Sequence, residues 1–178
     1  NLFAPLGSTN TYLMDNDGHL VHTWASGYRP GHAVYLLEDG TLLRTGNTGG
    51  TNFNNGGAGG RIERLDWDGS VLWACQYTGA NYRAHHDVAP MPNGHILVIA
   101  WERKSYVEAV AAGRDPALLE AGELWADHVV EIAPTGAWGG EIVWEWHVWD
   151  HLIQDHDNTK AHYGVVADHP ERIDLNFA

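Results

Sequence analysis

The sequence has few cysteines, few basic residues and no long apolar run, and each shortage excludes a class of protein. Its single cysteine, Cys75, excludes an internal disulfide framework and a cysteine-rich zinc site. It has 10 Lys and Arg against 23 Asp and Glu, and the net charge of -13 argues against nucleic acid as a partner, because phosphates would be repelled. No stretch is long and apolar enough to predict a membrane-spanning helix.

The sequence also lacks an initiator methionine and a secretory signal. Its first residues are Asn1-Leu2-Phe3-Ala4, and we expect them to begin a mature or truncated product. Its last residues, Asp174-Leu175-Asn176-Phe177-Ala178, stop in the middle of a pattern. We therefore expect a truncated chain, and the missing signal carries no information about the compartment.

What the sequence does contain predicts a turn-rich β protein. Of its 178 residues, 44% are hydrophobic, and it holds 9 Trp and 21 Gly, so it can bury a core as one domain. Short apolar runs flank turn signals, because Asn and Gly tolerate the positive φ that tight hairpin turns require. We predict five hairpins, which span residues 11–24, 33–45, 61–73, 84–102 and 129–146.

Two longer segments connect these hairpins, and they differ in their predicted structure. The stretch from Gly46 to Gly60 has the composition of a loop, and the stretch from Ser105 to Glu123 indicates a short helical excursion. The run Ile96–Ala100 is apolar enough to predict a strand buried on both faces. The turns are Asp17-Gly18, Asp39-Gly40, Asp68-Gly69, Pro92-Asn93-Gly94 and a wider one through Thr135-Gly136 and Gly139-Gly140.

Two kinds of hairpin alternate along the chain. The first kind has an acidic or proline-containing turn and ends in tryptophan, at Trp24, Trp73 and Trp144. The second kind begins with a histidine eight positions before the glycine of its turn. The order first, second, first, second, first indicates an internal repeat of about 50 to 65 residues with four strands, within the range of a β-propeller blade.

The repeat predicts an all-β fold, a β-propeller of four-stranded blades with about two and a half blades in this chain. Equivalent positions in successive blades surround one axis, so His32 and His86 would face one central channel. The alternative is a β-sandwich of hairpins. A ring needs about four to eight blades, so the others would come from the rest of a longer chain or from another chain. The predicted ranges are 8–60 and 61–104 for two blades, 105–125 for the excursion and 126–178 for the start of a third blade.

Several segments resemble the arylsulfotransferase family, bacterial sulfotransferases that act on aryl sulfates without a nucleotide sulfate donor. The ordered motifs His85-His86-Asp87, Pro92-Asn93-Gly94, Ile142-Val143-Trp144-Glu145-Trp146 and Asp150-His151-Leu152 carry most of the resemblance. It extends to the segment from Thr11-Tyr12-Leu13 to Gly18, and to Tyr35-Leu36-Leu37-Glu38-Asp39-Gly40 and Leu65-Asp66-Trp67-Asp68-Gly69. The resemblance implies a six-bladed propeller that is exported to the periplasm or the cell surface.

The chemistry that the resemblance implies is a transfer in two steps. A histidine takes the sulfuryl group from a phenolic sulfate ester and passes it to an acceptor phenol. By resemblance, His86 is the first candidate for this histidine and His151 is the second. The nucleophilic histidine can also lie in blades outside this chain. An aryl sulfate and a phenol are the expected partners.

Four residues are candidates for holding the substrate. His32 shares the register of His86, and Arg83, three residues before His86, carries a guanidinium that matches sulfate oxygens. Asp87 can orient an imidazole or cap a turn. His147 lies in a polar segment that follows a predicted buried strand, and it can point into the channel mouth.

The same polar segment, residues 147–158, supports an alternative in which a metal is bound. The expectation is that no cofactor is needed, but imidazoles and carboxylates suit a divalent ion such as zinc or calcium. A metal-dependent hydrolase is therefore a rival function, and so is a non-catalytic propeller that acts as an extracellular binding or structural scaffold. A homo-oligomer is compatible with either. The candidate metal ligands are His147, Asp150, His151, Asp155 and Asp157, with Asn158 for calcium.

Overall fold

The computed structural model describes residues 1–50, 52–53, 55–119 and 122–177. Within this part of the chain no helix is long and apolar enough to cross a membrane. The helices are α1 (Tyr106–Ala112) and three 3-10 turns, η1 (Pro116–Leu118), η2 (Val148–His151) and η3 (Val166–Asp168). The strands are β1 (Leu2–Phe3), β2 (Asn10–Met14), β3 (Leu20–Ala25), β4 (Arg29–Leu36), β5 (Leu42–Asn47), β6 (Gly60–Leu65), β7 (Val71–Gln76), β8 (Tyr82–Pro90), β9 (Ile96–Ser105), β10 (Glu123–Pro134), β11 (Gly140–His147), β12 (Leu152–Ile153) and β13 (Ile173–Asp174).

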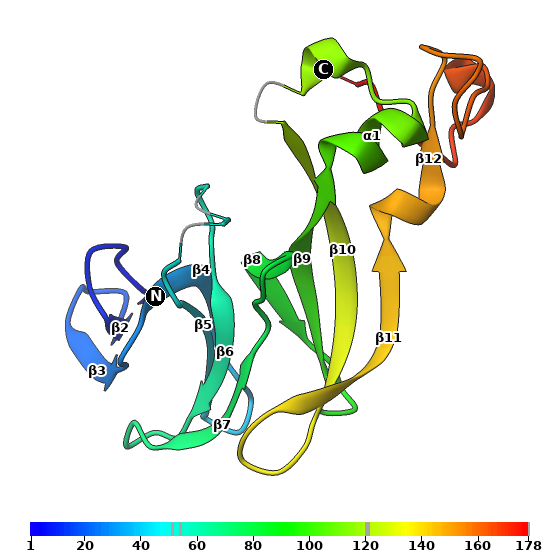
Figure 1. The fold of residues 1–178 in the computed structure, drawn as a ribbon. Coiled ribbons are helices and arrows are strands. Elements are labelled where there is room, and N and C mark those ends of the chain that lie inside the picture. The colour runs from blue at the N-terminus through cyan, green and yellow to red at the C-terminus, as the bar shows by residue number, and fades with distance from the viewer. Residues whose placement is uncertain (51, 54, 120–121, 178) are drawn as a thin grey trace. The chain divides into compact units, whose positions relative to one another are not determined.

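The strands form mostly antiparallel sheets of three or four members (Figure 1). In hydrogen-bonding order these sheets are β1-β2-β3, β4-β5-β6-β7 and β11-β10-β9-β8, and β12 pairs with β13 in parallel. The predicted all-β fold is therefore confirmed. The propeller itself stays a prediction, and so do the predicted blade ranges.

The chain divides into two compact units. The first unit comprises Asn1–Ala100 and Val130–Trp144, and the second comprises Trp101–Val129 and Glu145–Ala178. Because the strands β9, β10 and β11 contain residues of both units, the division falls within strands rather than in a linker. The two units are described in turn.

In the first unit, the predicted hairpin turns close at their glycines. Gly18, Gly40, Gly69 and Gly94 have φ between 82° and 87°, a left-handed conformation that residues with a Cβ adopt only at a cost. The turn glycines thus fix the ends of the hairpins β2–β3, β4–β5, β6–β7 and β8–β9.

The core of the first unit gathers side chains from the sheets β4–β7 and β8–β11. It includes Cys75, which is 9% exposed. The strand β9, predicted to be buried on both faces, buries Ile96, Val98 and Ala100, whereas Leu97 on the opposite face of the pleat is only half-buried. The core cluster consists of Ala33, Leu43, Ile62, Trp73, Cys75, Ala84, Val88, Ile96, Val98, Val130 and Ile132.

The two four-stranded sheets are offset from the sequence repeat by one hairpin. The sheet β4-β5-β6-β7 joins a hairpin of the second kind to the next hairpin of the first kind, and the sheet β8-β9-β10-β11 does the same. Each sheet therefore has a histidine-bearing strand at one edge, β4 or β8, and a tryptophan-bearing strand at the other edge, β7 or β11.

The second unit contains the predicted helical excursion, and residues 120–121 of that excursion lie outside the described part. Helix α1 begins with a capping box, in which Ser105 accepts a hydrogen bond from the backbone N–H of Glu108 and the Glu108 side chain accepts from that of Ser105. Ala112, Leu152 and Leu175 form a small apolar core for this unit.

Candidate active site

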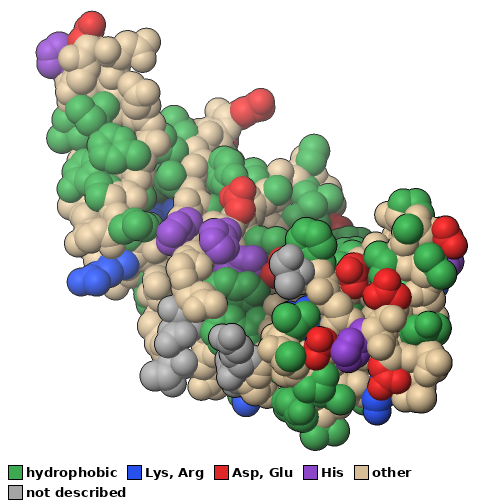
Figure 2. All heavy atoms as spheres, turned by 90° about the horizontal axis from the view of Figure 1, so that it is seen from above, with side chains coloured by type: hydrophobic (Ala, Val, Ile, Leu, Met, Phe, Trp, Pro, Cys, Tyr) green, Lys and Arg blue, Asp and Glu red, His purple; other side chains and the backbone are tan. Residues whose placement is uncertain are grey.

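The first unit brings together the two histidines that the repeat relates to each other. His32 lies on β4 and His86 on β8, and these strands contact each other although they belong to different sheets (Figure 1). The ring centroids are 5.7 Å apart and the ring planes are inclined by 58°. Both side chains are exposed. On the face drawn in Figure 2, histidine side chains gather among apolar and acidic ones.

Both histidines have a left-handed backbone. The φ angle is 84° at His32 and 50° at His86, a conformation that costs a residue with a Cβ about 1–2 kcal/mol. At His32 the strand pairing is also irregular, because the register between β4 and β5 shifts between Pro30 and Val34. Backbone strain of this kind concentrates at functional sites, so the pair is the leading candidate for one.

The ring of His86 packs against Gly57 of the long loop between β5 and β6. The backbone N–H of His86 donates a hydrogen bond of 2.7 Å to the carbonyl oxygen of Gly57. A Cβ added to Gly57 would lie 2.3 Å from both Cε1 and Nε2 of His86 and 2.6 Å from Cδ2. These near-equal distances place Gly57 over a face of the imidazole. No sequence pattern indicated this contact, because it joins segments far apart in the chain.

His85 is the buried neighbour of His86. Its side chain is 6% exposed, and its Nδ1 lies 2.8 Å from Nδ1 of His86. The two rings are nearly perpendicular, at 88°. Only one nitrogen of such a pair can donate the proton, so this hydrogen bond couples the tautomers of the two rings. The motif His85-His86-Asp87 did not indicate this contact between the two rings.

Asp87 bonds to a tyrosine on the neighbouring strand. The hydroxyl of Tyr35 donates a hydrogen bond of 2.7 Å to Oδ1 of Asp87, and that oxygen also accepts one of 2.8 Å from the backbone N–H of Val88. The hydrogen bond to Asp87, together with partial burial and the negative charge, raises the pKa of Tyr35 above its usual range. Asp87 is therefore fixed between β4 and β8 beside the histidines.

Arg83 is almost fully buried beneath the loop that carries Gly57. Its side chain is 3% exposed. The guanidinium donates to the carbonyl oxygens of Phe53 and Gly59, each at 3.0 Å, and to Oδ1 of Asn47 at 2.8 Å. Burial lowers its pKa, but a guanidinium remains charged in proteins. These contacts brace the loop against β8.

The other two predicted site histidines lie in the second unit, and each stacks on an aromatic ring. His147 is parallel to His128 with ring centroids 5.0 Å apart, and His151 stacks on Trp146 at 4.9 Å. Nδ1 of His147 lies 3.3 Å from Oε1 of Glu102. His151 is half-buried at the end of η2.

The five predicted metal ligands do not gather into one group. Oδ1 of Asp157 accepts hydrogen bonds from the backbone and the hydroxyl of Thr159, which lower the pKa of Asp157 and form a turn. Among the described residues, the set close enough together to share an ion is Asp15, Asp17 and His19. There, Oδ1 of Asp15 accepts from the backbone N–H groups of Asp17 and His19, as in a hairpin turn.

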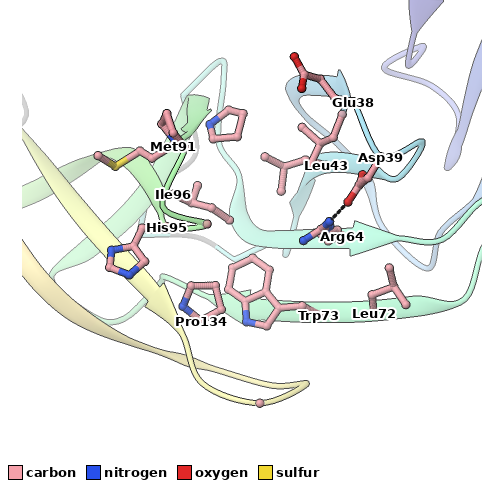
Figure 3. Close-up of a pocket in the computed structure, with 15 residues that line it drawn as sticks. Glu38, Asp39, Leu43, Arg64, Leu72, Trp73, Met91, His95, Ile96 and Pro134 are labelled. Atoms are coloured by element: carbon pink, nitrogen blue, oxygen red, sulfur yellow. Dashed lines mark hydrogen bonds and ion pairs between the residues drawn. The ribbon is translucent and has the colours of Figure 1, made fainter.

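The first unit also contains a cavity whose lining does not include these histidines, and it was not predicted. It has a volume of about 820 Å³, and its lining includes Trp73, Pro134, Ile96 and the turns that follow β4, β8 and β10 (Figure 3). Two pairs lie at its lining: Arg64 bonds Asp39, as Figure 3 shows, and Nδ1 of His95 lies 2.6 Å from Oε1 of Glu131. The carboxylate of Glu38 adds a further acidic group to the lining, which otherwise includes many apolar side chains.

Comparison with known proteins gives one family and a set of solved structures. The family model described as Arylsulfotransferase (ASST) matches residues 6–174. Of the solved structures, 15 chains match; one is a crystal structure of a protein of unknown function from Bacteroides caccae, with 15% sequence identity and a TM-score of 0.38. That match covers 82% of this chain and 56% of that chain, so this chain spans just over half of that protein's length. No curated protein matches significantly.

Proposed function

Because the chain belongs to the arylsulfotransferase family, we propose that it transfers a sulfuryl group from a phenolic sulfate ester to a phenol, with His86 as the carrier. The observation that carries this proposal is the pair His32 and His86, both held left-handed with ring centroids 5.7 Å apart. Strain that two neighbouring histidines retain is explained if their orientation is needed for chemistry.

In the proposed first step, Nε2 of His86 attacks the sulfur of the donor. A nitrogen–sulfur bond forms, the bond between sulfur and the aryl oxygen breaks, and the leaving phenolate takes a proton from protonated His32. In the second step, the acceptor's oxygen attacks the sulfur, the nitrogen–sulfur bond breaks, and neutral His32 takes the acceptor's proton. Covalent catalysis of this kind divides one difficult transfer into two easier ones. No cofactor is needed, because imidazole is the nucleophile.

His85 is proposed as the positioning residue for this nucleophile. If His86 donates its Nδ1 proton to Nδ1 of His85, 2.8 Å away, the lone pair of His86 lies on Nε2, where the attack requires it. Gly57 lies over a face of the His86 ring. The contacts of Arg83 support a role in holding this loop, and its predicted role in binding sulfate oxygens stays a prediction.

The proposal also covers other candidate histidines, the compartment in which the protein acts and the rest of its fold. His151 and His147 are second candidates, for carrier and substrate binding respectively, and the nucleophile can also lie in a part of the protein outside this chain. We propose that the protein acts in the periplasm or outside the cell, as part of a six-bladed propeller. The further blades would come from a longer chain or from another chain.

The test is transfer from a chromogenic aryl sulfate to a phenol, with and without a chelator, in the wild type and in His86→Asn. Asn tolerates the left-handed backbone, so the substitution removes the imidazole with little added strain. The matched control is His162→Asn, since His162 is also left-handed, with φ of 60°, but lies in the second unit. We expect His86→Asn to lose transfer by about a thousandfold or more and the control to retain it.

Other outcomes would replace the proposal. Transfer that survives His86→Asn would exclude His86 as the carrier. Phenol release that a chelator stops would favour the metal-dependent hydrolase. Absence of turnover with any aryl sulfate would favour the non-catalytic scaffold.

A further inference from the structure

The cavity shown in Figure 3 has well-formed walls and one carboxylate that no cation in the described part of the chain neutralises. Its lining comes from the sheets β4–β7 and β8–β11, within residues 37–136, so its walls lie well inside the chain. Its volume of about 820 Å³ is within the range of sites that hold a small organic molecule, about 300–1,000 Å³. The groups on its walls determine which molecule fits.

The walls of this cavity are mainly apolar. The side chains of Leu43 and Trp73 line it, together with three prolines, Pro90, Pro92 and Pro134. Proline has no backbone N–H, so these three residues offer no backbone donor to a ligand. A molecule that fills the cavity therefore needs an apolar body.

Many polar groups of the walls already have partners. The indole N–H of Trp73 donates a hydrogen bond of 2.8 Å to the carbonyl oxygen of Gly139, so the ring offers a ligand only its aromatic surface. In the turn after β4, the backbone N–H of Leu37 donates to Thr41 at 2.8 Å, and that of Gly40 donates to Leu37 at 2.9 Å. The turn after β8 closes through two equivalent bonds, of 2.9 and 3.0 Å. Binding of a polar group therefore depends on the charged side chains.

Among these charged side chains, one carboxylate has no counter-charge. The lining includes the carboxylates of Glu38 and Asp39 and the guanidinium of Arg64. Arg64 bonds Asp39, and its Nε donates a hydrogen bond of 2.8 Å to the hydroxyl of Thr41. Hydrogen bonds from Thr41, together with the charge of Arg64, hold the pKa of Asp39 below its usual range. Glu38 is exposed and forms no ion pair within the described part of the chain.

The imidazole of the lining does not change this balance. Nδ1 of His95 lies 2.6 Å from Oε1 of Glu131, a carboxylate that balances the charge of a protonated imidazole. An anionic ligand would meet Glu38 and no unmatched cation among the described residues of the lining. An ammonium group would meet that carboxylate and the aromatic face of Trp73, both of which attract cations.

We propose that this cavity binds a small organic ammonium ion, a molecule with an apolar ring system and a single positive charge. The ring system would lie against Trp73 and Leu43, and the ammonium group would lie near the carboxylate of Glu38. The site is separate from the histidine pair, which is not part of the lining. It does not rest on sulfuryl transfer, and the same walls disfavour an aryl sulfate.

The probe for this site is 4-phenylbutylamine. Its matched control is 4-phenylbutyrate, which carries the same ring on a chain of similar length but has the opposite charge. Equilibrium dialysis of the protein at neutral pH and about 0.15 M salt measures both. We expect a Kd of about 1 mM or tighter for the amine, as for other ligands of its size, and binding about fivefold weaker for the butyrate.

Glu38→Gln tests the carboxylate. In this variant the amine should bind about two- to fivefold more weakly than in the wild type, which is the effect of one exposed ion pair. The butyrate should bind more tightly than in the wild type, because the repulsion is removed. The matched control is Asp17→Asn, which removes one negative charge from the exposed turn between β2 and β3 and should leave the binding of both probes unchanged.

A second pair of variants tests the position of the ligand. Leu72 lines the cavity and is 43% exposed, whereas its neighbour Val71 is 40% exposed and is not part of the lining. Leu72→Lys places a cation at the cavity, so the amine should bind about fivefold more weakly and the butyrate more tightly than in the wild type. Val71→Lys should change neither.

The proposal is overturned if the amine does not bind at about 10 mM, if the butyrate binds as tightly as the amine, or if Leu72→Lys and Val71→Lys weaken amine binding equally. Equal losses in Asp17→Asn and Glu38→Gln would assign the binding to the net charge of -13 rather than to the cavity, and would overturn the proposal as well.

Discussion

At the scale of single residues, the site depends on one glycine that no polar motif would reveal. Gly57 has φ of 86°, and a methyl group there would overlap the ring of His86. A substitution at this position therefore combines two costs, backbone strain and displacement of the imidazole.

We predict that Gly57→Ala lowers the free energy of unfolding more than Gly18→Ala does. Gly18 has the same φ, 86°, but open space around its Cα, so its substitution isolates the cost of the left-handed backbone, about 1–2 kcal/mol. Gly57→Ala should add the cost of moving His86. Urea unfolding of both variants measures the difference. Equal losses of unfolding free energy would show that the His86 ring can be displaced at no cost in stability.

Tyr35 gives a prediction for alkaline pH. Its hydroxyl donates to Asp87, and the pKa of Tyr35 is raised above the value of about 10 that an unfolded chain has. The resulting stabilisation is fully present below about pH 10 and is lost as the pH rises through the raised folded pKa. The absorbance titration of the wild type, after subtraction of that of Tyr35→Phe, should show one tyrosine that ionises at a higher pH than an ordinary tyrosine.

The control for this titration is Asp87→Ala, which removes the acceptor. In that background, the same difference should return toward the ordinary tyrosine range. A late ionisation that persists would assign the raised pKa to burial alone, whose effect is smaller than that of the hydrogen bond to Asp87.

The sequence located the histidine pair but not its supports, and the reason lies in the range of the contacts. His32 and His86 stand out because each lies eight positions before a turn glycine. The contacts of His86 with Gly57 and of Asp87 with Tyr35 join different strands and loops, so their partners depend on how the sheets meet. Spacing along the chain does not contain that information.

At the scale of elements, a buried ionic group holds β5 and β6 together. Glu63 is 2% exposed; it accepts from Arg44 at 2.8 Å through Oε1 and from Arg61 at 2.8 Å through Oε2. Arg44 is itself 1% exposed, and burial lowers its pKa. A charge in this position is tolerated only while its partner remains.

We predict that Glu63→Gln destabilises the protein by about 3–5 kcal/mol, because it leaves buried guanidinium groups without a counter-charge. The matched control is Glu123→Gln. Its partner Arg103 lies at 2.5 Å but has 45% of its side chain exposed, so the loss should be about 0–1 kcal/mol. Thermal unfolding of the two variants would contradict this account if their losses were equal.

The hairpins were predictable because each depends on a few local residues. A turn glycine between two apolar runs determines where a strand stops and returns. The joining of hairpins into sheets was not predictable in the same way, since β5 pairs with β6 across the long connection of residues 48–59. For the same reason, the sequence did not show that β10 starts as early as Glu123.

At the scale of the whole molecule, composition and patterning predicted the fold class, and the family match bears out the resemblance read from the motifs. The division into two units was not predicted, because it falls within the long strands β9, β10 and β11 rather than in a linker of distinct composition. In the sequence, residues 147–158 stand out as a dense group of polar side chains. In the structure, Asp157 and His151 have separate local partners, Thr159 and Trp146.

The lone thiol of the chain provides a way to time the opening of the first unit. Cys75 lies in the core cluster at 9% exposure, and burial raises its pKa, so little reactive thiolate is present while the core is closed. A thiol reagent can react with Cys75 only after the strands around this residue separate. Because no second cysteine competes, the labelling rate of the unmodified protein reports that separation directly.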